Sequence, residues 1–228
     1  MNIEIWSDVI CPFCYIGKTH LETALAGFPG KENVTVHHRA FRLMPNETPS
    51  PVEQMFARRY GQSAEQAQAS LRNVEGMAAQ AGLEFHLDGT WAGDTTDAHV
   101  LLALAFDKGL EADLLNRLYR AYFTETRSVF DRESLMALGE EVGLMPDEMQ
   151  GALDLPELRA RVAADQRQAE MMRVRGVPFV LIDGKFAVSG AQPPQAFRQA
   201  LDAAQDAKKQ ATPIGADGDV CGPDGCAI

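Results

Sequence analysis

The sequence has few basic residues and no long hydrophobic run. Lys and Arg number 21 against 32 Asp and Glu, which gives a net charge of −11. This charge would repel phosphate backbones and anionic lipid headgroups, so we expect neither nucleic acid nor a membrane surface as a partner. No apolar stretch reaches the roughly 20 residues that a membrane-spanning helix needs. Because the N-terminus also lacks a basic segment followed by an apolar run, we expect a cytoplasmic protein.

Cysteine is scarce as well, with four in 228 residues. A chain of this length can bury a large apolar core, so it needs no disulfide to fold. Hydrophobic residues make up 46% and charged residues 23%, which is typical of soluble globular proteins. In a reducing compartment thiols are usually catalytic, metal-binding or redox-sensing. The first pair, Cys11 and Cys14, is therefore the first candidate site.

Hydrophobic patterning predicts a strand, a helix and a second strand in the N-terminal part. Residues 2–7 and 33–41 alternate as strands do, and residues 14–28 have a helical pattern. This unit has the length that a right-handed crossover between parallel strands requires. Helical periodicity then continues from residue 52 to about residue 173, and Asp131 is a predicted N-cap within it.

Strand patterning returns at residues 177–190, where an Asp183-Gly184 turn predicts a hairpin. A last helix is expected to follow and to end near residue 207. With the central helical segment set aside, the order is β-α-β followed by β-β-α. This is the order of a thioredoxin fold, an α/β fold with a central mixed β-sheet and flanking helices. We expect three parts: a discontinuous thioredoxin-like domain of residues 1–50 and 174–210, a large all-helical insertion of residues 51–173, and a C-terminal tail of residues 211–228.

The first cysteine pair, in the sequence CPFC, lies where the first strand gives way to a helix. Free N–H groups at a helix N-terminus and the helix dipole stabilise a thiolate, so Cys11 is the candidate nucleophile. Cys14 follows one turn later, close enough to displace a substrate from Cys11 and to form an intramolecular disulfide. Pro12 suits the first turn because it has no N–H to lose, and Phe13 adds no charge.

Val177-Pro178 is the second candidate element, because it directly precedes a predicted strand. A cis peptide bond is nearly always an X-Pro bond, and this position is one where it is expected. In a thioredoxin fold this turn faces the dithiol. Its backbone can pair with an extended substrate, and it keeps the sulfurs from capturing a metal. We therefore expect CPFC and Val177-Pro178 to form one active site.

The other two cysteines, Cys221 and Cys226, lie in the tail sequence CGPDGC. Their spacing of four residues does not complete a zinc site with CPFC, so no metal is expected. One interpretation is a second, auxiliary redox pair that exchanges disulfides with Cys11 and Cys14. The other is an exposed pair without a catalytic role. We favour the redox pair because all four cysteines occur in close pairs.

The segments SDVICPFCYIGK, FRLMPNE and RGVPFVLIDGKFAVSGAQPPQAFRQAL resemble the DsbA-like thioredoxin superfamily, and in particular its FrnE-type branch. The resemblance implies a cytoplasmic thiol-disulfide oxidoreductase or isomerase that acts on protein disulfides and needs no bound cofactor. It implies Cys11 as the nucleophile, Cys14 as the resolving thiol and Val177-Pro178 as a cis-proline turn. Pro12, Phe13 and Val177 would contact the thiol- or disulfide-bearing protein substrate.

The segment DTTDAHVLLALA also resembles that branch, which usually has asparagine where Asp94 stands, and it makes His99 the histidine of interest. Two alternatives stay open. The 2-hydroxychromene-2-carboxylate isomerases and kappa-class glutathione transferases resemble this chain in architecture, but typically have serine in place of Cys11. A glutathione-dependent isomerase or transferase is one alternative, and glutathione is a candidate redox partner, because a helix N-terminus can hold its carboxylate. The other is a redox-regulated, chaperone-like binding module.

Overall fold

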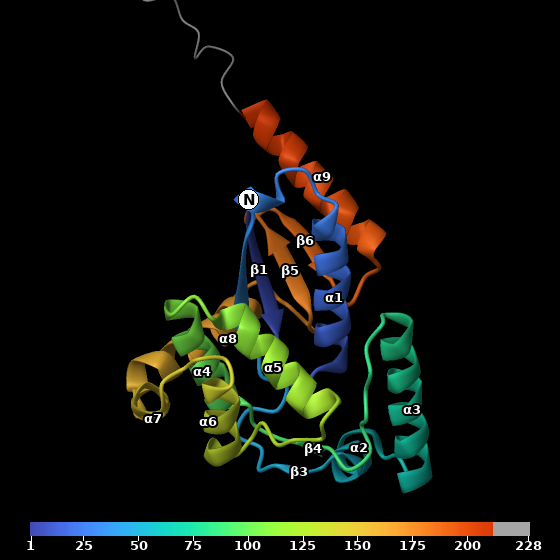
Figure 1. Ribbon diagram of the computed structural model, residues 1–228. Coiled ribbons are helices and arrows are strands. Elements are labelled where there is room, and N and C mark those ends of the chain that lie inside the picture. The colour runs from blue at the N-terminus through green and yellow to red at the C-terminus, as the bar shows by residue number, and fades with distance from the viewer. Residues whose placement is uncertain (212–228) are drawn as a thin grey trace, which may run out of the picture.

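The main sheet of the protein has four strands in the order β2-β1-β5-β6. The computed structural model describes residues 1–211 (Figure 1). β1 runs parallel to β2, and β5 is antiparallel to both β1 and β6. This mixed sheet confirms the thioredoxin fold that the sequence predicts. Its strands are β1 (Asn2–Ser7), β2 (Thr35–Ala40), β5 (Phe179–Ile182) and β6 (Phe186–Ser189).

Helices cover both faces of this sheet because its strands alternate apolar side chains between the faces. On one face Ile3 and Ile5 of β1 pack with residues of α1 (Pro12–Ala26) and α9 (Pro194–Ala211), among them Leu21 and Phe197. On the other face Trp6 is fully buried, and its Nε1 donates to the carbonyl oxygen of Asp165 in α8 (Pro156–Met171) at 3.0 Å. The sheet therefore lies between two helical layers.

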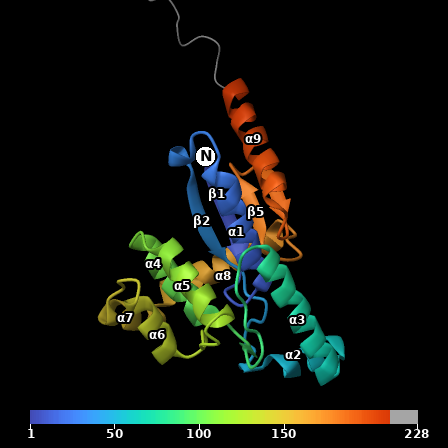
Figure 2. The same ribbon diagram turned by 45° about the vertical axis from the view of Figure 1, so that its right-hand side comes forward.

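The helical insertion begins after β2 and forms two groups (Figure 2). One group is a pair of helices on one side of the molecule, and the other is a bundle below the sheet. The pair is α2 (Val52–Tyr60) and α3 (Ala64–Gln80), and the bundle is α4 (Thr96–Asp107), α5 (Glu111–Phe123), α6 (Arg132–Glu140) and α7 (Pro146–Asp154). Before the insertion, a short 3-10 helix (Lys31–Asn33) precedes β2.

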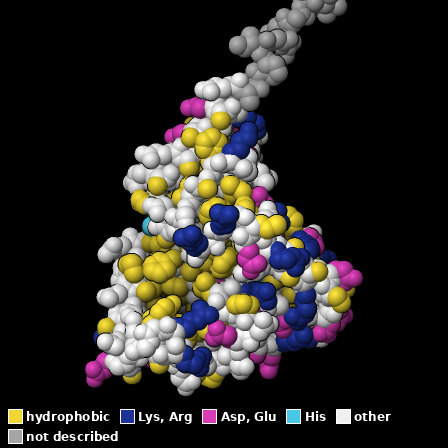
Figure 3. Space-filling view, turned by 180° about the vertical axis from the view of Figure 1, so that it is seen from behind, with side chains coloured by type: hydrophobic (Ala, Val, Ile, Leu, Met, Phe, Trp, Pro, Cys, Tyr) yellow, Lys and Arg dark blue, Asp and Glu magenta, His cyan; other side chains and the backbone are white. Residues whose placement is uncertain are grey.

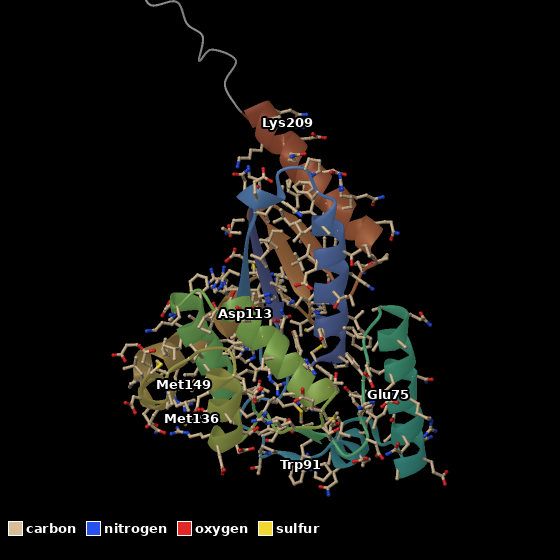
Figure 4. The ribbon with its side chains drawn as sticks, viewed as in Figure 1. Glu75, Trp91, Asp113, Met136, Met149 and Lys209 are labelled. Carbon is tan, nitrogen blue, oxygen red and sulfur yellow. The ribbon has the colours of Figure 1, made fainter. Side chains whose placement is uncertain are left out.

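A second, two-stranded sheet joins the two groups of helices. β3 (Ser50–Pro51) pairs antiparallel with β4 (Trp91–Ala92), and Trp91 lies at the end of the molecule remote from Lys209 of α9 (Figure 4). The helical pattern of residues 52–173 did not predict β4, because a strand of two residues is too short to show alternation.

Several element boundaries differ from the predicted ones. α1 begins at Pro12 rather than at residue 14, because proline is accommodated at the first helical position, and it ends at Ala26 rather than at residue 28. β2 is shorter than predicted, and α9 continues to Ala211 rather than ending near residue 207. Basic residues in its last turn favour this extension because they face the negative end of the helix dipole.

Two local predictions are confirmed. The hairpin turn has positive φ at Asp183 (48°) and Gly184 (68°), and the Lys185 N–H donates to the Ile182 carbonyl at 3.0 Å. Asp131 caps α6, and its side chain accepts from the Ser134 N–H at 2.8 Å.

The buried apolar residues form two clusters. The smaller one lies between the sheet, α1 and α9. The larger one fills the insertion and continues to the start of α1, where it includes Cys11 and Cys14. The packing around the two thiols is therefore shared by the sheet and the insertion. The division into residues 1–50 with 174–210 and residues 51–173 stays a prediction.

Candidate active site

The two thiols of CPFC occupy the N-terminal end of α1. Cys11 is the N-cap residue with an extended backbone (φ −89°, ψ 111°), and Pro12 is the first helical residue. The Cys11 carbonyl accepts from the N–H of Cys14 at 3.0 Å and from that of Tyr15 at 3.4 Å. Both cysteines are free thiols. The helix start thus holds Cys14 one turn behind Cys11.

Both cysteines are buried in the structure. Cys11 is 4% exposed and Cys14 is 1% exposed. The buried neighbours Val9 and Ile10 and the covering turn at Val177 both contribute to this burial. Cys11 still borders a cavity at the protein surface, whereas Cys14 does not. Of the two thiols, Cys11 is therefore the one that borders the cavity.

The Val177-Pro178 peptide bond is cis, which is the geometry that the sequence predicts. The thiol of Cys11 donates to the Val177 carbonyl oxygen, with 3.8 Å between sulfur and oxygen. The close approach of α1 to this turn depends on Gly17, because a Cβ added there would lie 2.7 Å from Cγ of Pro178. CPFC and the cis-proline turn therefore form one site.

A cavity of about 480 Å³ opens beside Cys11. The walls of this cavity are mostly apolar. In the space-filling view from behind, hydrophobic side chains gather at mid-height on the side where α2 and α3 lie (Figure 3). Pro12, Phe13 and Val177, the predicted substrate contacts, all line this cavity. Its opposite wall is formed by Met44 and by residues of the insertion, which include Val52, Met55, Phe56, Leu71 and Val74.

A hydrogen bond from the chain after α3 supports this wall. Glu75 lies on α3 (Figure 4), and its Oε1 accepts from the Leu87 N–H at 2.7 Å. Leu87 itself lines the cavity. The capping box of Ser63 and Gln66 fixes the start of the same helix. The insertion thus provides a defined surface opposite the dithiol.

The environment of Cys14 favours its protonated form. Burial raises the pKa of the Cys14 thiol well above its ordinary value, and a hydrogen bond with Cys11 acts in the same direction. The negative charges of Cys11 and Asp8 add to this effect, whereas the Asp8 backbone opposes it. Burial likewise raises the pKa of Tyr119 and of Tyr122 on α5, so both phenols stay neutral.

The sequence analysis missed Asp8, a buried acid three residues before Cys11. Asp8 is 0% exposed, its Oδ2 accepts from the Leu43 N–H at 2.7 Å, and its Oδ1 lies 3.4 Å from Nε2 of His99. His99, which the sequence analysis singled out, is 4% exposed. The available signal was an acidic residue directly before two apolar ones and the cysteine pair.

Asp94 lies away from the dithiol, at the start of α4. Its carboxylate accepts from the backbone N–H groups of Asn46 and Thr96, at the start of α4, and it does not line the cavity at Cys11. Cys221 and Cys226 lie outside the described residues. Within residues 1–211 no group of three or more His, Cys, Asp or Glu side chains is arranged to hold a metal ion. No helix in this range is long and apolar enough to cross a membrane.

A thioredoxin fold with a dithiol at a helix N-terminus and a facing cis-proline turn defines the thiol oxidoreductase class. The family of DSBA-like thioredoxin domains matches residues 2–202 of this chain, and the chain belongs to that family. A probable DsbA oxidoreductase from Streptomyces coelicolor is 42% identical, with a TM-score of 0.86 over 100% of this chain and 99% of its own.

Two further relatives share most of their length with this chain. The uncharacterized protein YwbO of Bacillus subtilis is 29% identical over 219 residues, which cover 91% of this chain and 99% of YwbO. The cytosolic disulfide reductase DsbM from Pseudomonas aeruginosa is 21% identical, with a TM-score of 0.62 over 92% of this chain and 98% of DsbM. The similarity to DsbM shows the shared fold.

Proposed function

We propose that the protein catalyses thiol-disulfide exchange on protein substrates through Cys11 and Cys14. The observation that carries this proposal is the arrangement of three features at one site. Cys11 lies at the N-terminus of α1, its thiol approaches the Val177 carbonyl at 3.8 Å, and it borders the apolar cavity. Cys14 is held one helical turn away, is buried and does not border the cavity.

In the reducing direction, the Cys11 thiolate attacks a substrate disulfide. A bond forms between Cys11 and one substrate sulfur, and the other substrate sulfur leaves as a thiolate. Cys14 then attacks Cys11, which forms the intramolecular disulfide and releases the second substrate thiolate. Oxidation of a substrate runs through the same steps in reverse, and isomerisation uses the first step and its reversal.

The surroundings of Cys11 suit an extended polypeptide substrate. The exposed backbone of a cis-proline turn can pair with an extended segment, as edge strands do. Pro12, Phe13 and Val177 then contact the residues next to the substrate sulfur, and the apolar cavity accepts a neighbouring hydrophobic side chain. We therefore propose unfolded or partly folded proteins with exposed disulfides or thiols as substrates.

We also propose a cytoplasmic location and the FrnE-type branch for this chain. The fold is shared with DsbM, a protein described as a cytosolic disulfide reductase that has also been solved with glutathione. Glutathione is accordingly the candidate that recycles the dithiol. The glutathione-dependent isomerase remains the alternative, because a 2-hydroxychromene-2-carboxylate isomerase shares the fold as well, at 15% identity and a TM-score of 0.61.

An insulin-reduction assay tests this proposed function. We expect the protein to accelerate insulin reduction by a dithiol reductant, and Cys11→Ser to abolish the acceleration because the nucleophile is lost. Activity that survives Cys11→Ser would contradict the dithiol mechanism. Turnover of a small electrophile that needs glutathione, together with no insulin reduction, would favour the glutathione-dependent isomerase or transferase.

The second cysteine pair remains part of the proposal as an auxiliary redox pair. If Cys221 and Cys226 exchange with the active site, Cys14→Ser should form an internal disulfide between Cys11 and one of them, which peptide mapping detects. If Cys11 crosslinks to substrate and never to Cys221 or Cys226, the pair has no such role.

A further inference from the structure

A further cavity lies beside β4, and the steps of thiol-disulfide exchange do not use it. It has a volume of about 420 Å³, within the roughly 300–1,000 Å³ that is common for ligand pockets. It lies where the chain at β3 and β4 meets the loop between α5 and α6. We call it the Trp91 cavity, and its lining includes Pro49, Thr90, Trp91, Tyr122, Ser128 and Phe130.

β4 separates the Trp91 cavity from the cavity at Cys11. Successive side chains of a strand point to opposite faces, so Trp91 lines the Trp91 cavity whereas Ala92 lines the cavity at Cys11. Thr90 and Tyr122 line both cavities. A chain bound in the cavity at Cys11 therefore borders the Trp91 cavity at these two residues.

Aromatic rings supply the apolar part of the Trp91 cavity. Trp91 is 49% exposed, although tryptophan is highly buried in most proteins. The rings of Tyr122 and Phe130 meet edge to face, with 6.2 Å between their centroids and an interplanar angle of 84°. The Tyr122 hydroxyl donates to the Trp91 carbonyl at 2.6 Å, so its polar atom is satisfied within the protein. These rings offer a surface on which another aromatic ring packs favourably.

The charged residues that line the Trp91 cavity have partners in the protein. Nη1 of Arg127 donates to Oε1 of Glu141 at 2.7 Å, and Oδ1 of Asp131 accepts from the Ser134 N–H at 2.8 Å. A charged occupant would have to compete with these bonds, whereas an apolar side chain leaves them intact. The cavity therefore favours a neutral, apolar occupant.

The walls of the Trp91 cavity are held in place by close packing and hydrogen bonds. A Cβ added to Gly93 would lie 2.6 Å from the Cα of Pro49, so the chain after β4 packs directly against the segment before β3. The Ser134 hydroxyl donates to the Ser128 carbonyl at 2.6 Å, which ties the loop before α6 to that helix. A preformed cavity of this kind binds with a smaller loss of conformational entropy.

We propose that the Trp91 cavity binds an aromatic side chain of the same polypeptide whose sulfur reacts with Cys11. The inference rests on the proposed dithiol function and deepens it, because it names the substrate class: chains with an aromatic residue at some distance from the reactive cysteine. The occupant is the substrate, since a chain held at Cys11 already lies beside the shared border at Thr90 and Tyr122. Binding at one cavity then raises the effective concentration of the chain at the other.

Steady-state reduction of a peptide series by the full-length protein, with a dithiol reductant present, tests the proposal. Each tryptophan-free peptide carries one cysteine, in a disulfide with a small thiol, and one phenylalanine after a short or a long Gly-Ser spacer. With the long spacer, we expect phenylalanine to lower KM by about tenfold relative to serine at the same position, as one buried aromatic anchor can do. Trp91→Ala should remove this difference, and its effect should be confined to the long spacer.

Phe106→Ala is the matched aromatic-to-alanine control, because Phe106 is 42% exposed and lines neither cavity. This variant should keep the difference between the phenylalanine and serine peptides. Equal KM values of the parent protein for the two long peptides would overturn the inference, and so would a difference that Trp91→Ala retains. If the parent protein reduces none of the peptides, the proposed function fails instead.

Tryptophan fluorescence gives a second readout, which depends neither on turnover nor on the folding of a Trp91 variant. The chain has two tryptophans, and Trp6 is 0% exposed, so a change in emission on binding reports Trp91. In a full-length variant with every cysteine except Cys11 replaced by serine, each peptide is attached to Cys11 as a mixed disulfide. We expect a blue shift of the emission with the long phenylalanine peptide, no shift with its serine counterpart, and reversal on reduction.

Three results of the fluorescence measurement would contradict the proposed occupant. Identical emission in the phenylalanine and serine adducts would show that the cavity does not bind the side chain. An emission that depends on protein concentration without peptide would indicate a second copy of the chain over Trp91. The same shift with free N-acetylphenylalaninamide at micromolar concentration would indicate a site for a small aromatic molecule.

Discussion

At the scale of single residues, burial determines which groups are charged. His38 on β2 has a buried Nδ1 without a hydrogen-bond partner in residues 1–211. Burial lowers its pKa from 6.5 to about 3, and the nearby charges of Lys18 and His37 act in the same direction. The folded protein therefore holds this ring neutral at pH values where the unfolded chain protonates it.

This difference predicts an acid-dependent loss of stability. Between about pH 6.5 and pH 3 the unfolded state binds one more proton at His38, so the free energy of unfolding falls as the pH is lowered. The contribution is at most about 1.4 kcal/mol per pH unit. We expect His38→Gln, which is neutral throughout, to flatten the pH dependence of urea unfolding in this range. An unchanged slope would show that His38 is accessible to protons in the folded state.

At the scale of elements, the contact between α1 and the cis-proline turn positions the site. Gly17 lies on the face of α1 that meets Pro178 and Ala191. Its missing Cβ permits the contact, since a Cβ would lie 2.7 Å from Pro178 Cγ and 3.3 Å from the Cα of Ala191. The sulfur of Cys11 and the Val177 carbonyl are held together by this packing.

We expect Gly17→Ala to destabilise the protein by about 1–3 kcal/mol, because an added methyl group forces α1 and the turn apart. The same variant should lower the rate of attack by Cys11. Gly76→Ala on α3 is the matched control, because nothing lies within 4 Å of the new Cβ. That variant should raise stability by up to about 1 kcal/mol, as alanine favours helices. Chemical denaturation measures both, and equal effects would contradict the role of Gly17.

Elements whose formation depends on a few adjacent residues could be predicted from the sequence. The hairpin and the cap of α6 depend on the local residues Asp183, Gly184 and Asp131, so their sequence signals are direct. The two-residue β4 carries a weak signal because it depends on pairing with β3.

For the site, the sequence located the cysteine pair and the cis-proline turn because each has a compact motif. It did not locate Asp8, whose burial depends on distant residues, Leu43 and His99. It also did not predict that Cys11 would be buried, because the covering turn comes from Val177 at the other end of the chain. Contacts between segments far apart in the sequence leave no local pattern.

At the scale of the whole molecule, the cavity beside Cys11 joins the thioredoxin-like part with the insertion. One wall comes from CPFC and Val177, and the other comes from α2, α3 and the chain that follows α3. Tyr60 at the end of α2 lines this cavity and is 63% exposed, so it can be replaced without loss of core packing.

We expect Tyr60→Glu to raise KM for a polypeptide disulfide by roughly tenfold, which corresponds to about 1.4 kcal/mol of lost binding. The reaction with a small aromatic disulfide should not change, because it does not need the outer part of the cavity. Met171→Glu is the control, since Met171 is also exposed but does not line the cavity. Equal effects of the two variants on KM would show that the cavity does not bind the substrate.

The most direct test of the central claim, that Cys11 attacks and Cys14 resolves, is a trapping experiment with Cys14→Ser. The variant is incubated with a peptide disulfide, alkylated, digested and mapped by mass spectrometry. The account predicts a stable mixed disulfide on Cys11, which the parent protein resolves. A mixed disulfide on another cysteine, or no adduct in a folded variant, would contradict it.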